Sequence, residues 1–175
     1  PEKYVLTCDY EIVALGSFGS SVAILTTGMP YIASGTAPEN MVMEKIEVNL
    51  PCISARGVVD LGYAVAYPSH QGLVSVSSSG ASLVTLGLLT RDQWLQMNPY
   101  SFVAGQYSGR WMASYAYTDE GGSEKRGIII IDLTGESSFL IRSTDFADAM
   151  HYDIQSGAIY VLKAGTDIYE WDSLA

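Results

Sequence analysis

Short apolar segments alternate with turn residues along this chain, and the pattern returns four times. Each unit has a glycine or turn, a strand with small apolar residues at its centre, a second turn and another apolar strand. The equivalent positions Val22, Val65, Met112 and Ala149 lie roughly 40 residues apart, a spacing typical of propeller blades. The pattern predicts an all-β, antiparallel β-propeller-like protein of about four blades.

The individual strands can be placed within each unit. The first three units predict four strands each, at 11–18, 21–27, 30–35 and 41–48, then 57–61, 63–67, 73–77 and 81–85, then 101–107, 111–117, 127–133 and 137–143. The fourth unit is compressed into 145–153, 158–165 and 167–172. The run 128–131 has no polar alternation, so we expect a central strand that is covered on both faces.

One segment departs from the β pattern. Thr90 and Gln93 have the spacing of a capping box, apolar residues including Trp94 follow, and Asn98-Pro99 ends the pattern. We therefore expect a helix of about two turns between the second and third blades. Trp94 is expected to pin this helix to a blade, and its alternative role is as a contact for a partner protein.

The sequence is expected to form one propeller-like domain over residues 1–175, either a closed four-bladed ring or a sector of a larger propeller, and either whole or part of a longer polypeptide. A closed ring would need an N-terminal strand such as 4–7 to pair near the last blade. With 48% hydrophobic and 16% charged residues, the composition suits turns and strands that bury a core.

The net charge of −10, with only nine lysines and arginines, argues against specific binding to nucleic acid. An acidic surface favours solubility, and it would also suit a passage through which DNA slides. No apolar stretch is long enough to span a bilayer, so no membrane insertion is expected. Cys8 and Cys52 are interpreted as small buried residues rather than as a disulfide.

Tests for chemistry give no catalytic set, metal site or cofactor site. His70 and His151 have no second ligand at a metal-binding spacing, and the G-x-S-x-G and phosphate-binding glycine motifs are absent. A pair of carboxylates could serve a glycosidase, but no further motif supports one. We therefore predict a protein that is not an enzyme.

Two further features are candidate contacts with a ligand or partner. Trp111 and Tyr115, with Tyr107 and Tyr117, alternate in a way that would form a sugar-stacking strip if exposed, although a packed face is the favoured interpretation. Asp119 and Glu120 lie in a loop that could offer oxygen ligands to calcium, although a solvated hairpin tip is favoured. The candidate contact residues are thus Trp94, Trp111, Tyr115, Asp119 and Glu120.

The segments 30–41, 51–77, 88–99 and 168–173, in this order, resemble a group of virion proteins of tailed phages and prophages. These belong to the tail or the head-to-tail connector, and the group is similar to the β-propeller nozzle proteins of short tails. The resemblance implies a structural subunit of a ring around a DNA passage, with other virion proteins as partners and no catalytic residue. It also implies a location in the virion, and in the host cytoplasm during assembly.

Two other functions remain open. The first is a carbohydrate-binding or carbohydrate-hydrolysing propeller at a phage tail tip, which would use Trp111, Tyr115 or the loop 118–124. The second is a cellular propeller that acts as a platform for protein–protein interaction. Residues alone do not separate these functions from the virion role.

Overall fold

A computed structural model describes residues 5–134 and 139–171, and it has four antiparallel sheets in a four-blade β-propeller arrangement. Sheet 1 contains β1 Ile12–Phe18, β2 Ser21–Thr26, β3 Tyr31–Ser34 and β4 Val42–Lys45; sheet 2 contains β5 Val59–Asp60, β6 Val65–Pro68, β7 Leu73–Ser77 and β8 Gly80–Leu83. Sheet 3 contains β9 Val103–Tyr107, β10 Arg110–Thr118, β11 Glu124–Asp132 and β12 Phe139–Ser143; sheet 4 contains β13 Ala149–Asp153, β14 Ala158–Lys163 and β15 Asp167–Glu170. The predicted all-β propeller class is confirmed.

Each sheet is a meander in which consecutive strands pair, and the first strands of neighbouring sheets lie beside each other, β1 beside β5, β5 beside β9 and β9 beside β13. This arrangement corrects one detail of the repeat. Val22, Val65 and Met112 lie on the second strands β2, β6 and β10, whereas Ala149 lies on β13, the first strand of its sheet. Sheet 4 has three strands among the described residues. The spacing of the repeat therefore does not predict which strand of sheet 4 corresponds to the second strand of the other sheets.

The helix predicted between the second and third blades is present as α1, Arg91–Gln96. Its capping box forms as expected, because Thr90 Oγ1 accepts from the Gln93 amide at 3.2 Å and Gln93 Oε1 accepts from the Thr90 amide at 2.9 Å. Asn98 adopts a left-handed conformation with φ 54° after the helix, before the 3-10 turn η3, Pro99–Ser101. Two further 3-10 turns are η1, Pro38–Asn40, and η2, Ala55–Gly57.

The core lies between successive sheets, because each sheet buries a face against the next. Between sheets 1 and 2 the fully or largely buried residues include Phe18, Leu25, Tyr67 and Val76. The strand β11 serves two interfaces at once. Ile128 and Ile130 pack toward sheet 4, and Ile129 and Ile131 pack toward sheet 2, which confirms the expected central strand covered on both faces.

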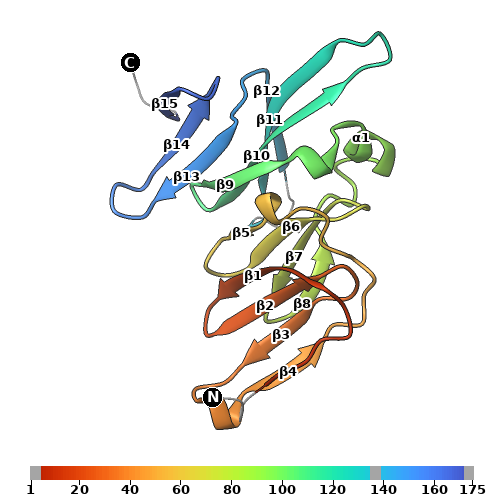
Figure 1. The fold of residues 1–175 in the computed structure, drawn as a ribbon, viewed down its shortest axis with the longest axis vertical. Coiled ribbons are helices and arrows are strands. Elements are labelled where there is room, and N and C mark those ends of the chain that lie inside the picture. The colour runs from red at the N-terminus through yellow and green to blue at the C-terminus, as the bar shows by residue number, and fades with distance from the viewer. Residues whose placement is uncertain (1–4, 135–138, 172–175) are drawn as a thin grey trace.

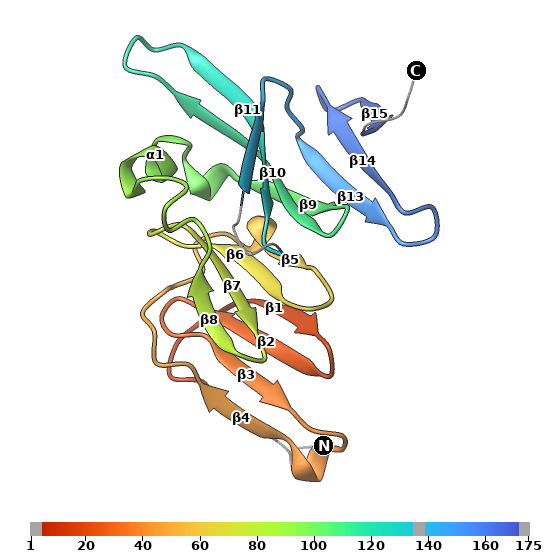
Figure 2. The ribbon, with the colours of Figure 1, turned by 180° about the vertical axis from the view of Figure 1, so that it is seen from behind.

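The four blades do not close on themselves among the described residues. Sheet 1 lies at one end of the long axis, and sheets 3 and 4 lie side by side at the other end, well away from sheet 1 in both views (Figures 1 and 2). Residues 5–7, the described part of the expected closing strand 4–7, are not in a strand. The segment that follows them lies on sheet 1, where the Asp9 amide donates to Tyr31 Oη at 3.0 Å and Lys45 Nζ donates to Asp9 Oδ2 at 2.9 Å.

Candidate functional site

The two tryptophans among the candidate contacts form the aromatic centre of the interface between sheets 2 and 3. Both side chains are fully buried. Trp94 Nε1 donates to the Ser69 carbonyl at 2.8 Å, and Trp111 Nε1 donates to the Gly57 carbonyl at 2.9 Å. Phe102 contacts both tryptophans, and the centroids of the three rings lie 5.2 to 6.2 Å from one another. The packing interpretation is confirmed for Trp94 and for Trp111, and neither indole is open to a ligand.

Tyr115 is half-buried on β10, on the same side of sheet 3 as Trp111. Its ring stacks on Tyr117, with centroids 6.2 Å apart and planes inclined by 22°. Tyr107 instead packs on the opposite side of the sheet, toward sheet 4. The four aromatic residues are therefore divided between two faces and do not form a continuous strip.

Asp119 and Glu120 lie at the exposed tip of the hairpin between β10 and β11, as the favoured interpretation expects. Asp119 Oδ1 accepts from the amides of Gly121 and Ser123 at 3.0 and 2.8 Å, and Lys125 Nζ lies 3.4 Å from Asp119 Oδ2. These contacts, the Ser123 amide above all, lower the pKa of the Asp119 carboxyl. The carboxylate is thus engaged in holding its own turn.

The histidines and cysteines are dispersed. His70 lies beside Tyr100, with ring centroids 5.7 Å apart, and His151 is exposed on β13. Within 5–134 and 139–171, no three side chains of histidine, cysteine, aspartate or glutamate come together to hold a metal ion. Cys8 and Cys52 are both free thiols. Burial raises the pKa of the Cys52 thiol to about 11, because it disfavours the charged thiolate.

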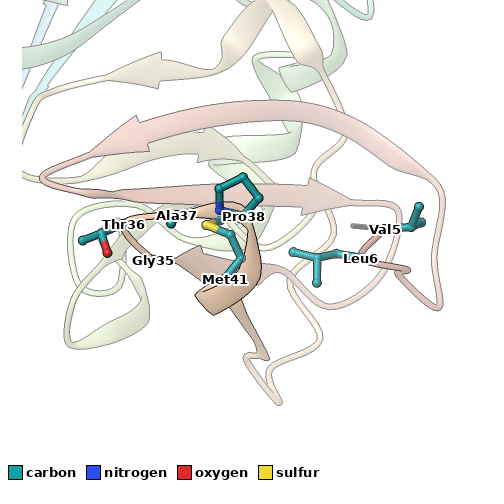
Figure 3. A pocket seen from close by; sticks show the side chains of 7 residues that line it. All are labelled: Val5, Leu6, Gly35, Thr36, Ala37, Pro38 and Met41. Carbon is teal, nitrogen blue, oxygen red and sulfur yellow. The ribbon is translucent and has the colours of Figure 1, made fainter. Parts of the chain in front are cut away.

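An apolar hollow of about 480 Å³ opens beside sheet 1 (Figure 3). Leu6 points toward Met41 and Pro38 from a separate segment of the chain, and Gly35 lies at the base of the loop. Gly35 has φ 155°, and a Cβ there would come within 2.8 Å of Met41 Cα. The lining residues carry no ionisable side chain, so this hollow offers no acid–base chemistry.

The two ends of the blade row expose apolar sheet faces. On sheet 4 a hollow of about 390 Å³ lies over the side that faces away from sheet 3, and its lining includes His151, Tyr160, Leu162 and Ile168. Ile168 is 71% exposed. We call this surface the sheet 4 end face.

The corresponding side of sheet 1 contains Leu15, Val22 and Ile24, which the pairing of β1 with β2 places together. Leu15 is 62% exposed, whereas Val22 is half-buried and Ile24 is buried, because the segment around Cys8 and Asp9 covers part of this side. We call it the sheet 1 end face. Neither end face is visible as a motif in the sequence, because its residues alternate with core residues on the same strands.

A third, polar pocket of about 160 Å³ lies between sheets 3 and 4, and we call it the arginine pocket. Arg56 comes from η2, Ser114 from β10, Arg126 from β11 and Asp148 from the residue before β13. Among the candidate contacts from the sequence, only Tyr115 lines it. The arginines could not be found by pattern, since they belong to different sheets and share no local motif.

Comparison with known proteins adds no relative: no model of a protein family matches the chain, and no curated protein sequence matches it. In the part of the chain that the structure describes, no helix is long and apolar enough to cross a membrane.

Proposed function

We propose that this chain is a structural subunit that assembles with further copies into a ring in the tail or head-to-tail connector of a phage, where the ring lines or supports a DNA passage. One observation carries the proposal: the four blades form an open row (Figure 1) in which the sheet 4 end face is apolar and exposed and the sheet 1 end face is apolar and partly exposed. In a propeller, a blade face of this kind normally lies against the next blade.

Packing inside the chain shows what such a face does when it has a neighbour. Sheet 3 buries Met112 and Ile130 against Ile159 and Val161 of sheet 4, and all four are at most 5% exposed. On the other side of sheet 4, Leu162 and Ile168 offer the same kind of side chain to solvent. Apolar area contributes about 25 cal/mol per Å² when it leaves water, so this face gains stability from a partner.

The occupant that we assign to the sheet 4 end face is the sheet 1 end face of the next copy. This contact would continue the arrangement inside the chain, where each sheet lies beside the next one through their first strands. Such a head-to-tail contact is heterologous, and it produces a closed ring if the rotation closes. Residues around Asp9, which cover part of the sheet 1 end face, would take part in the contact or move aside.

The acidic balance supports the DNA passage within this proposal. A ring of subunits that each carry a net charge of −10 repels the phosphate backbone, so DNA would slide rather than bind. The alternative of a carbohydrate-binding or hydrolysing propeller at a tail tip gains no observation in its favour, because Trp111 is fully buried.

The test is the oligomeric state of the purified chain, measured by light scattering over a range of concentrations and by negative-stain microscopy. We expect rings for the wild type, and we expect Ile168→Glu to dissociate them. Leu86→Glu is the matched control, because Leu86 is 80% exposed in the turn region that follows β8, away from both end faces. A wild type that stays monomeric at about 100 μM, where a contact with a micromolar Kd would already form, would overturn the ring.

The phage context has its own test. Mass spectrometry of purified particles should detect the chain in a fixed ratio to the other tail proteins, and genes for terminase and portal proteins should lie nearby. Absence from particles would reject the virion role, and it would favour the cellular interaction platform if the rings still form.

A further inference from the structure

The arginine pocket is built from three consecutive blades. Arg56 enters from η2 at the start of sheet 2, and its Nη2 donates to the Asp148 carbonyl at 2.8 Å. Arg126 approaches the same residue from sheet 3, with Nη1 3.6 Å from Asp148 Oδ1. Asp148, at the entrance to sheet 4, thus contacts both guanidinium groups, one through its backbone carbonyl and one through its carboxylate.

These guanidinium groups keep donors for a further ligand. A guanidinium carries five N–H groups in a planar fork, and the Asp148 carbonyl takes one from Arg56. Arg126 is engaged more fully, since its Nε also donates to Glu124 Oε1 at 2.8 Å and its Cζ lies 5.0 Å from the centroid of the Phe146 ring. Arg56 is therefore the group with the largest capacity to bind, and Arg126 adds positive charge beside it.

A buried hydroxyl adds a third donor. Ser114 is 5% exposed, and its Oγ accepts from the Ala147 amide at 2.9 Å. Accepting this bond leaves the hydroxyl hydrogen free to donate, and its contacts with the described residues include no acceptor for that hydrogen. A hydroxyl donor that lines a pocket beside two guanidinium groups favours an oxygen acceptor with negative charge.

Asp148 contributes negative charge to the same pocket. Its carboxylate lines the pocket, where Oδ1 faces Arg126 and Oδ2 accepts from the Gly165 amide at 3.2 Å. Arg56 and Arg126 bring two positive charges, and Asp148 and Glu124 balance them with two negative charges, so the paired N–H donors of Arg56 select the ligand and the net charge does not. A volume of about 160 Å³ also suits a small group better than a nucleotide or a sugar chain.

We propose that the arginine pocket binds one carboxylate group, held by Arg56 through paired N–H donors and by the Ser114 hydroxyl. The group belongs to a small free carboxylic acid or to the acidic side chain of a bound protein, which present the same chemistry. Paired donation from arginine to a carboxylate is the geometry that makes such sites selective. This inference does not depend on ring formation, because every lining residue lies within one chain.

The experiment is a titration of the intact chain with sodium acetate, read by the NMR shifts of the Ala147 and Ser114 amides, with sodium chloride at equal ionic strength as the reference. We expect saturable shifts with acetate and none with chloride. Arg56→Gln should weaken acetate binding by about tenfold or more, the loss expected when hydrogen bonds to a charged group are removed. Arg91→Gln is the matched control, because it removes the same charge from an exposed residue of α1 outside the pocket.

Each remaining outcome decides a part of the proposal. Absence of saturation at about 100 mM acetate, or equal weakening by Arg56→Gln and Arg91→Gln, would overturn the site. Tighter binding of phosphate than of acetate would overturn the carboxylate assignment.

Peptides that contain glutamate or aspartate, added at the same concentrations, distinguish the two sources of the carboxylate. A free acid is favoured if acetate or succinate binds better than the peptides, and a protein side chain is favoured if the peptides bind better. Ser114→Ala tests the hydroxyl, with a far-UV spectrum to verify the fold.

Discussion

Replacement of Trp111 by phenylalanine tests the coupling between sheets 2 and 3. The indole is fully buried, and its N–H reaches the Gly57 carbonyl next to β5 at 2.9 Å. Phenylalanine keeps an aromatic ring beside Phe102 but leaves a buried carbonyl without this donor, which costs about 1–3 kcal/mol. The smaller ring removes further buried carbon, at about 0.8 kcal/mol for each methylene equivalent. Two ring carbons are lost besides the nitrogen, so we expect Trp111→Phe to lower the free energy of unfolding by about 3–5 kcal/mol, the sum of these effects.

The measurement is urea unfolding followed by far-UV circular dichroism, since the substitution changes tryptophan fluorescence itself. Tyr100→Phe is the control, because Tyr100 is 59% exposed and the contact of its hydroxyl among the described residues is with His70, 3.3 Å to Nδ1. We expect this control to change stability by less than about 0.5 kcal/mol. If Trp111→Phe also remained within that range, the indole hydrogen bond and its packing could not be what joins the two blades.

Three further substitutions address separate contacts. The Asp132 carboxylate accepts from Arg110 Nε at 2.8 Å, and mainly for this reason its pKa falls to about 2. The pKa in the folded state thus lies below the unfolded value of about 3.9. The ionised carboxylate therefore stabilises the fold above pH 4. The stability advantage of the wild type over Asp132→Asn should therefore shrink as the pH falls from about 4 to 2, as measured by urea unfolding at each pH. Gly16→Ala would place a Cβ 2.5 Å from Val65 Cγ1 and should destabilise by about 1–3 kcal/mol, and Val65→Ala in the same chain should recover part of this loss in thermal unfolding. Thr90→Ala removes the acceptor of the α1 capping box and should cost about 1 kcal/mol, while Thr90→Ser should retain most of the stability.

A specific result would contradict each of these three predictions. A stability gap for Asp132→Asn that stays constant between pH 4 and pH 2 would mean that the Arg110 contact does not depend on ionisation. Strict additivity of Gly16→Ala and Val65→Ala would mean that the two sites do not touch across sheets 1 and 2. Equal losses of stability for Thr90→Ala and Thr90→Ser would mean that the Thr90 hydroxyl does not stabilise the helix cap.

Local patterns were enough to predict most elements of the fold. The four-isoleucine run of β11 is buried on both faces because sheet 3 lies between two other sheets, and an unbroken apolar run indicates such a position. The capping box of α1 forms between residues three apart, so it too could be read from the chain. In both cases the physical cause acts within one element or between a strand and its immediate neighbours.

Features that depend on distant residues were not accessible in the same way. The position of Ala149 within sheet 4 is set by the contact of β13 with β9 and not by the period of the repeat. The arginine pocket joins η2, β11 and the residue before β13, and no spacing in the sequence brings Arg56 to Arg126. Trp111 was a candidate contact because a strand pattern shows which side chains share a face but not whether another sheet covers that face.

The end faces and the charge of the chain act in opposite directions on assembly. Each copy carries a net charge of −10, so two copies repel at long range, while Leu162 and Ile168 of one copy gain from contact with the apolar side of the next. Screening reduces the first effect, since the Debye length falls from about 30 Å at 0.01 M salt to about 8 Å at 0.15 M, and apolar burial is not weakened by this change. Rings joined through the end faces should therefore be more stable at higher salt, which light scattering between these two concentrations would measure. A contact held mainly by ion pairs would dissociate over the same range, and that result would exclude the apolar end faces as the joint.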